Sequence, residues 1–153
     1  MRFSVQRNDL FKGLQKVSSV VPSRSLLPIL GNILFSAQNN SLTLSATDLE
    51  ISITTQIPIK GKENGNIAIP SRIINEIIKE LPESELEIIT DDKNKIQLKS
   101  NQGVYKISGE KDEEFPKLPS VDKKNEIIIN DELHKRMIDI SLFAASTDEL
   151  RPA

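Results

Sequence analysis

The stretch from Ser23 to Asn32 contains an arginine whose surroundings indicate a chemical role. Its sequence is Ser-Arg-Ser-Leu-Leu-Pro-Ile-Leu-Gly-Asn, and the prolines Pro22 and Pro28 disfavour a helix interior on either side. Arg24 has no acidic neighbour in sequence, and the apolar residues that follow predict a buried strand. Two interpretations are open. Arg24 is either a solvated surface residue or a cation that a rigid loop holds out for an anionic partner.

Acidic and histidine side chains give weaker grounds for catalysis or metal binding. His134 is the only histidine, and we expect it to be an exposed helix residue because no second histidine could complete a catalytic set with it. Asp48 and Glu50 lie two apart in a predicted strand and could hold Mg²⁺, but Asp48 is better interpreted as a turn residue. A metal-dependent enzyme is therefore the least favoured function. The chain has no cysteine and no phosphate-binding glycine loop, and we expect no cofactor.

Length and composition indicate a globular chain. With 153 residues, it forms one domain, or one domain and a piece of another. The hydrophobic fraction of 37% is sufficient for a packed core, so global disorder is not expected. No apolar run approaches the ~20 residues of a membrane span, and the N-terminus lacks the apolar run of a signal peptide. A cytoplasmic location is expected.

The charges are unevenly distributed along the chain. The net charge of −2 argues mildly against nucleic-acid binding. However, residues 8–24 carry the three cations Lys12, Lys16 and Arg24 against one carboxylate, a net charge of +2. Residues 82–94 carry five carboxylates against one lysine, a net charge of −4. The sequence therefore predicts a bipolar molecule, with a basic face on an acidic body.

An internal repeat organises the predicted elements. The first unit is predicted to contain a strand, a helix capped by Asn8 or Asp9, and three strands, at 2–6, 8–20, 29–37, 41–46 and 49–59, with an irregularity at Thr54-Thr55. The second unit repeats this order at 67–69, 71–81, 86–89, 96–98 and 104–107. A shift of 64 residues places Phe3 on Ile67 and Leu10 on Ile74. The predicted fold is α+β: a doubled strand–helix–three-strand unit with two helices packed on an antiparallel sheet.

The pattern begins a third time after a change in composition. Residues 110–126 are charged, proline-containing and polar, and are predicted to be a linker or a segment that ties two domains together. A strand with Ile127 and Ile129 and a helix capped by Asn130 follow, with an apolar stripe on the helix at Leu133, Met137, Ile138 and Leu142. We expect residues 1–120 to be a complete domain and residues 121–153 to be a linker and the start of a truncated second domain. The third helix should then pack on another chain, swap or be disordered.

A set of short motifs lies along the chain at characteristic spacings: Arg24, Leu27–Asn32, Thr47–Glu50, Pro70-Ser71-Arg72, Leu81-Pro82, Phe115-Pro116 and Arg151. With these motifs at these spacings, the chain resembles the N-terminal part of the bacterial DNA sliding clamp, the beta subunit of DNA polymerase III. It implies a DNA-clamp (processivity) fold with three doubled domains per subunit. Two such subunits close into a ring around DNA, with the helices lining the hole.

The resemblance also implies roles for particular residues. Arg24 and Arg72 correspond to DNA-contacting arginines of the family. Lys12, Lys16 and Lys79 lie on helices that would face the DNA, where weak phosphate contacts permit sliding. Further polar and aromatic DNA contacts of the family fall on positions that here read Asp148, Pro152 and Ala153.

The implied function is that of a non-catalytic processivity factor of the replicative polymerase. Its implied partners are double-stranded DNA, a second subunit in a homodimeric ring, and polymerase and clamp-loader subunits that bind regions absent here, with no membrane. A chain of this length is expected not to close a ring alone. The alternative is an interaction module or inhibitor that copies a clamp surface without binding DNA, which the acidic outer strands would favour.

Overall fold

The computed structural model describes residues 1–117 and 128–145. The chain divides into two units, Met1–Leu118 and Pro119–Ala153. Parts of three predictions lie outside the described residues. These are residues 118–126 of the predicted linker, Ile127 of the strand predicted for the third repeat unit, and the positions near the end of the chain, namely Asp148, Arg151, Pro152 and Ala153.

The first unit follows the predicted repeat of elements. Its first half contains β1 (Arg2–Gln6), α1 (Arg7–Ser18), the 3₁₀ turn η1 (Pro28–Gly31), β2 (Asn32–Gln38), β3 (Ser41–Thr47), β4 (Ser52–Pro58) and β5 (Lys60–Glu63). Its second half contains β6 (Gly65–Pro70), α2 (Ser71–Glu80), β7 (Glu85–Thr90), β8 (Lys95–Ser100), β9 (Gly103–Ser108) and the 3₁₀ turn η2 (Asp112–Glu114). The α+β class is confirmed.

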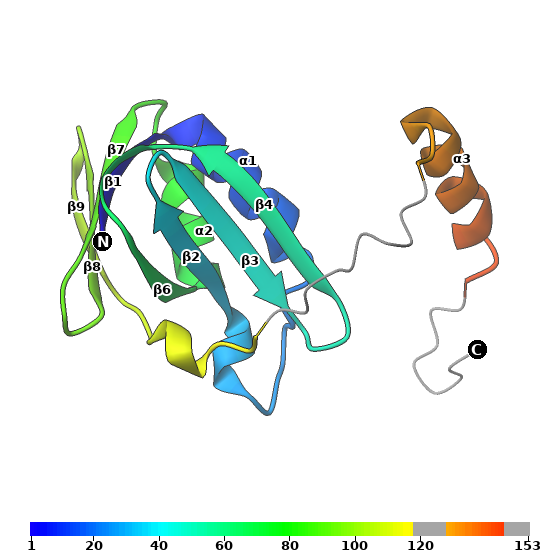
Figure 1. Cartoon of the computed structure of the whole chain (residues 1–153), viewed down its shortest axis with the longest axis horizontal. Helices are drawn as coiled ribbons and strands as arrows, with labels where there is room; N and C mark the ends of the chain where they lie inside the picture. The colour runs from blue at the N-terminus through cyan, green and yellow to red at the C-terminus, as the bar shows by residue number, and fades with distance from the viewer. Residues whose placement is uncertain (118–127, 146–153) are drawn as a thin grey trace. The chain divides into compact units, whose positions relative to one another are not determined.

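The strands form two antiparallel sheets, whereas one sheet was predicted. Sheet A has the order β5-β1-β7-β8-β9 and sheet B the order β4-β3-β2-β6 (Figure 1). Each half of the repeat contributes its first strand to the other half's sheet: β1 pairs with β7, and β6 pairs with β2. Each sheet therefore combines strands of both halves, because β1 leaves its own half to pair with β7 and β6 leaves its own half to pair with β2.

One hydrophobic core lies between the sheets and the helices. Strand alternation and the helical stripes place the repeat-related apolar residues inside it, where each is at most 4% exposed: Phe3, Val5, Leu10, Leu14, Val17, Ile67, Ile69, Ile74, Ile78 and Leu81. The shift of 64 residues therefore relates structurally equivalent positions. The repeat also accounts for the two helices, because each has one apolar stripe to bury.

Several predicted element boundaries are wrong for local reasons. Helix α1 begins at Arg7 after Gln6, so neither Asn8 nor Asp9 is its N-cap. Residues 28–31 form a 3₁₀ turn and not the start of a strand, because Pro28 has no N–H for a ladder and its fixed φ suits a first helical turn.

The predicted third strand of the first half is shorter and regular. Strand β4 pairs with β3 without interruption, so there is no irregularity at Thr54-Thr55. The chain instead leaves sheet B at Ile59 and enters sheet A as β5. Leu49 and Ile51, predicted to be strand residues, lie in the turn before β4, and each is 58% exposed.

The beginning of the predicted linker is packed on the domain. Glu110 forms an antiparallel bridge with Ala68, with N···O distances of 2.9 and 3.0 Å. Phe115 is buried, and η2 lies between these two residues. The linker prediction is therefore wrong for residues 110–115.

The second unit contains α3 (Asp131–Leu142). The Asn130 side chain accepts hydrogen bonds from the N–H groups of Glu132 (3.0 Å) and Leu133 (3.2 Å), which confirms the predicted cap. The described residues 128–130 are not in a strand. No described side chain of α3 is buried, including those of the predicted apolar stripe. Within the parts of the chain that the structure describes, no helix is long and apolar enough to cross a membrane.

Candidate nucleic-acid interface

Helices α1 and α2 pack side by side in antiparallel orientation. At one end, the Arg7 guanidinium donates to the carbonyl oxygens of Ile78 (2.8 Å) and Lys79 (2.7 Å), which end α2. At the other end, Asn75 Nδ2 donates to Ser18 Oγ at 2.9 Å. The start of α1 therefore meets the end of α2. The Arg7 contacts also satisfy carbonyl groups that a helix C-terminus leaves without intrahelical partners.

Basic side chains project from the exposed sides of this helix pair. Lys12 and Lys16 are exposed on α1, and Arg72 and Lys79 are exposed on α2. Arg72 Nε lies 3.0 Å from Glu76 Oε1, and the two side chains are 89% and 65% exposed. An ion pair this exposed contributes little stability, so Arg72 can exchange Glu76 for another anion at small energetic cost.

Arg24 lies in the loop that leads from α1 to η1. The loop is held by hydrogen bonds from Leu27 N to Ser25 Oγ (3.0 Å) and from Leu30 N to Leu27 O (3.1 Å). Leu30 is buried, but Leu27 is half-exposed, so only part of this apolar run enters the core. Arg24 is exposed and makes no hydrogen bond or ion pair with any residue in 1–117 or 128–145.

A hollow of about 450 Å³ connects this loop with the start of α2. Its lining comes from the end of α1, the loop, η1 and the first turn of α2: Ser18, Val21, Pro22, Ser23, Gly31, Ser71 and Arg72. Arg24 directly follows the lining residue Ser23. The fold thus brings the Arg24 loop and Arg72 to one end of the helix pair, whereas Lys79 lies at the other end, beside Arg7.

The chemistry available here is attraction of anions without recognition of bases. Five cations are spread along two helices and one loop: Lys12, Lys16, Arg24, Arg72 and Lys79. Such residues contact phosphate groups and carry no sequence information themselves. Sequence reasoning identified these cations, but it missed Arg7 and Asn75, which fix the two helices against each other.

The Asp48–Glu50 metal hypothesis is not supported. Asp48 Oδ1 accepts hydrogen bonds from Ile51 N (2.7 Å) and Glu50 N (2.9 Å), so its carboxylate organises the turn. The backbone N–H of Ile51 is the main reason that the pKa of Asp48 is lowered. Among the residues that the structure describes, no group of three or more His, Cys, Asp or Glu could hold a metal ion. His134 is an exposed residue of α3, as predicted.

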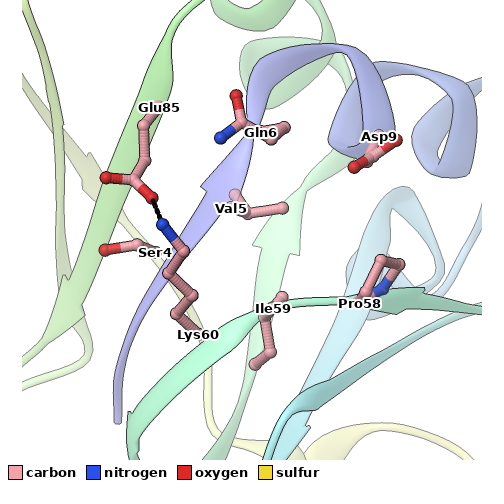
Figure 2. Close-up of a pocket in the computed structure, with 8 residues that line it drawn as sticks. All are labelled: Ser4, Val5, Gln6, Asp9, Pro58, Ile59, Lys60 and Glu85. Carbon is pink, nitrogen blue, oxygen red and sulfur yellow. Dashed lines mark hydrogen bonds and ion pairs between the residues drawn. The ribbon is translucent and has the colours of Figure 1, made fainter.

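A small pocket beside β1 offers no catalytic arrangement. Figure 2 shows its lining residues, which are Ser4, Val5, Gln6, Asp9, Pro58, Ile59, Lys60 and Glu85. The volume is about 190 Å³, below the 300–1,000 Å³ that is usual for ligand sites. Lys60 Nζ and Glu85 Oε1 form an ion pair at 2.6 Å, so the two charged groups neutralise each other.

The comparisons with known proteins agree with this geometry. Residues 1–119 match the family model for the N-terminal domain of the DNA polymerase III beta subunit. The chain belongs to this family. The resemblance inferred from Arg24, Leu27–Asn32 and the other landmark residues is therefore confirmed.

Individual family members cover nearly the whole chain. The beta sliding clamp of Halalkalibacterium halodurans is 32% identical over 99% of this chain, and that of Chlamydia pneumoniae is 33% identical over 99%. The crystal structure of the DNA polymerase sliding clamp from Bacillus subtilis superposes with a TM-score of 0.93 at 30% identity, covering 99% of this chain. The chain spans 42%, 41% and 42% of these three proteins, respectively.

Proposed function

We propose that this chain contributes to a sliding clamp, a non-catalytic processivity factor that keeps a replicative polymerase on duplex DNA. The observation that carries the proposal is the antiparallel α1–α2 pair with its exposed cations, in a chain that aligns with beta sliding clamps over 99% of its length. The DNA is held through phosphate contacts that do not depend on base sequence.

The DNA-contacting residues in this proposal are Arg24, Arg72, Lys12, Lys16 and Lys79. Together with Arg7, they are six cations, set against the three carboxylates Asp9, Glu76 and Glu80, so the loop and helix pair carry a net charge of +3. A protein that slides needs weak contacts, because strong binding to any one position would stop it. This modest excess of positive charge suits that requirement.

The proposal assigns residues 1–120 to a first clamp domain and residues 121–153 to the beginning of a second. In this proposal the first domain contacts a second subunit of the ring. The polymerase and the clamp loader would contact parts of a clamp outside the two fifths that this chain matches. Replication also places the working protein in the cytoplasm. The 153-residue chain alone then binds DNA without encircling it.

Retention on circular DNA tests the topological part of the proposal. The chain is mixed with nicked circular DNA and with the same DNA made linear, and bound protein is measured by gel filtration as salt is raised. We expect equal loss from both DNAs, because five open phosphate contacts, each adding about −0.9 to the slope of log K against log salt, weaken binding by roughly 500-fold between 50 and 200 mM salt. A full-length relative with its loader is the positive control. Retention of this chain on the circle alone at high salt would show that it closes a ring.

A further inference from the structure

The face of sheet A that points away from the core is basic. Because Phe3, Leu86, Ile96 and their alternate neighbours point into the core, the intervening residues of these strands point outward. The outward-facing charged residues are the cations Arg2, Lys60, Lys62, Lys95, Lys99 and Lys106 and the carboxylates Glu63, Glu85 and Glu87. Six cations against three carboxylates give +3, so this face is not the acidic exterior that the sequence suggested.

Three cations of this face converge on one carboxylate. Glu87 lies 2.7 Å from Arg2 Nη2, 3.2 Å from Lys62 Nζ and 3.7 Å from Lys99 Nζ. The cluster therefore keeps a net charge of +2 even though every member is paired. Such an arrangement holds like charges close together and leaves a positive field for an external anion.

Two further lysines are free of carboxylates. Lys95 Nζ donates to Ser108 Oγ at 2.7 Å, and neither Lys95 nor Lys106 forms an ion pair with a described residue. They lie on the neighbouring strands β8 and β9, where Gln97 pairs with Lys106 and Lys95 pairs with Ser108. These two side chains can meet an anionic ligand without breaking an internal ion pair, and the Lys95 ammonium keeps further N–H donors beside its bond to Ser108.

The layout of the cations favours one kind of polyanion. They occupy four of the five strands, and adjacent strands lie about 4.8 Å apart, so the array extends over ~19 Å across the sheet. Tyr105 and Phe3 face inward, and the outward positions of these strands carry no aromatic residue on which single-stranded bases could stack. A flat, wide array fits the two phosphate strands of a duplex better than one extended acidic peptide.

We propose that the outer face of sheet A is a second surface for the phosphate backbone of duplex DNA. It shares no residue with the loop and helix pair of the proposed function and does not depend on it. A chain with both surfaces could contact two duplex segments, or one segment that passes outside the clamp.

The test neutralises only the two unpaired lysines. The double variant Lys95→Gln/Lys106→Gln should keep the wild-type melting temperature, because no ion pair is lost. Duplex affinity is measured by fluorescence anisotropy over a salt series, beside the separate Arg24→Ala/Arg72→Ala variant. We expect at least fivefold weaker binding at low salt and a plot of log K against log salt that is flatter by about 2. An unchanged affinity and slope would overturn the proposal.

Two further arms separate the explanations. Lys95→Arg/Lys106→Arg keeps both charges and should bind duplex like the wild type; an equal loss in it would contradict electrostatic binding. Polyglutamate serves as the acidic-protein probe, and a loss of polyglutamate binding without a loss of duplex binding would also overturn the proposal. If only Lys95→Gln/Lys106→Gln weakens duplex binding, the proposed function fails and this inference stands. If only Arg24→Ala/Arg72→Ala weakens it, this inference fails and the proposed function stands.

Discussion

Asn75 on α2 donates a hydrogen bond of 2.9 Å to the hydroxyl of Ser18, the last residue of α1. The same amide nitrogen lies 2.8 Å from the carbonyl oxygen of Ser71, so it joins the first turn of α2 to the end of α1. These contacts set the distance between the two helices beside the hollow that Arg72 lines. The position of Arg72 relative to the Arg24 loop therefore depends on a neutral side chain that is not one of the five candidate cations.

Replacing Asn75 with alanine should destabilise the domain. The change removes the bond between the helices and leaves Ser18 with only its bond to the Leu14 carbonyl, so we expect a loss of about 1–2 kcal/mol. Urea unfolding followed by circular dichroism measures it. Glu80→Ala, at an exposed position of the same helix, is the matched control and should change the free energy of unfolding by less than about 0.5 kcal/mol. Equal effects of the two changes would refute the role given to Asn75.

Arg7 should matter for stability through its hydrogen bonds more than through its charge. Its guanidinium caps the last carbonyls of α2 and lies 4.5 Å from the centre of the Phe11 ring. Arg7→Lys keeps the charge, but an ammonium group cannot donate both hydrogen bonds in the geometry of the planar guanidinium. We therefore expect it to lose most of the roughly 1–3 kcal/mol of unfolding free energy that Arg7→Ala loses. Thermal unfolding of both variants decides this. A lysine variant as stable as the wild type would show that charge alone is sufficient.

Gly61 should tolerate no side chain. A Cβ atom there would lie 1.6 Å from the backbone oxygen of Asn39, so Gly61→Ala must move the β2–β3 turn or the β5 backbone. We expect a loss of more than about 2 kcal/mol in the free energy of unfolding. Gly103 is the matched control: a Cβ atom there meets nothing within 4 Å, and Gly103→Ala should be neutral or slightly stabilising. Equal changes in the free energy of unfolding for the two variants would contradict the steric conflict between a side chain at position 61 and the Asn39 backbone.

Acid should weaken sheet A through Glu87. Hydrogen bonds from Arg2 and then Lys62 lower the pKa of Glu87 from its usual 4.5 to about 2. Because the folded-state pKa is depressed, its stabilisation is fully present above pH 4.5 and is lost as the pH falls from about 4.5 toward about 2. Glu87→Gln should therefore be less stable at pH 7 and show a weaker decline over that window in urea unfolding. The exposed Glu83→Gln variant should behave like the wild type.

The repeat could be predicted from sequence because both halves bury equivalent apolar residues, such as Leu10 and Ile74. The division into two sheets could not be predicted, because β1 pairs with a strand far along the chain, Arg2 with Ile89 and Gln6 with Glu85, and no local sequence pattern indicates that pairing. The five candidate cations were visible by residue type alone. The roles of Arg7 and Asn75 could not be predicted, since their partners lie 71 and 57 residues away along the chain. The basic outer face of sheet A also could not be predicted, because the strand register is needed to assign each lysine to one side of the sheet.

The proposed contact of Arg24 and Arg72 with DNA phosphates is tested by the salt dependence of duplex binding by the Arg24→Ala/Arg72→Ala variant. It is measured by fluorescence anisotropy with two duplexes of unrelated sequence, with Lys111→Ala as the exposed control. We expect the variant to bind about tenfold more weakly at low salt, with a plot of log K against log salt flatter by about 2 and the same loss for both sequences. Affinity and slope equal to those of the wild type and of Lys111→Ala would contradict it.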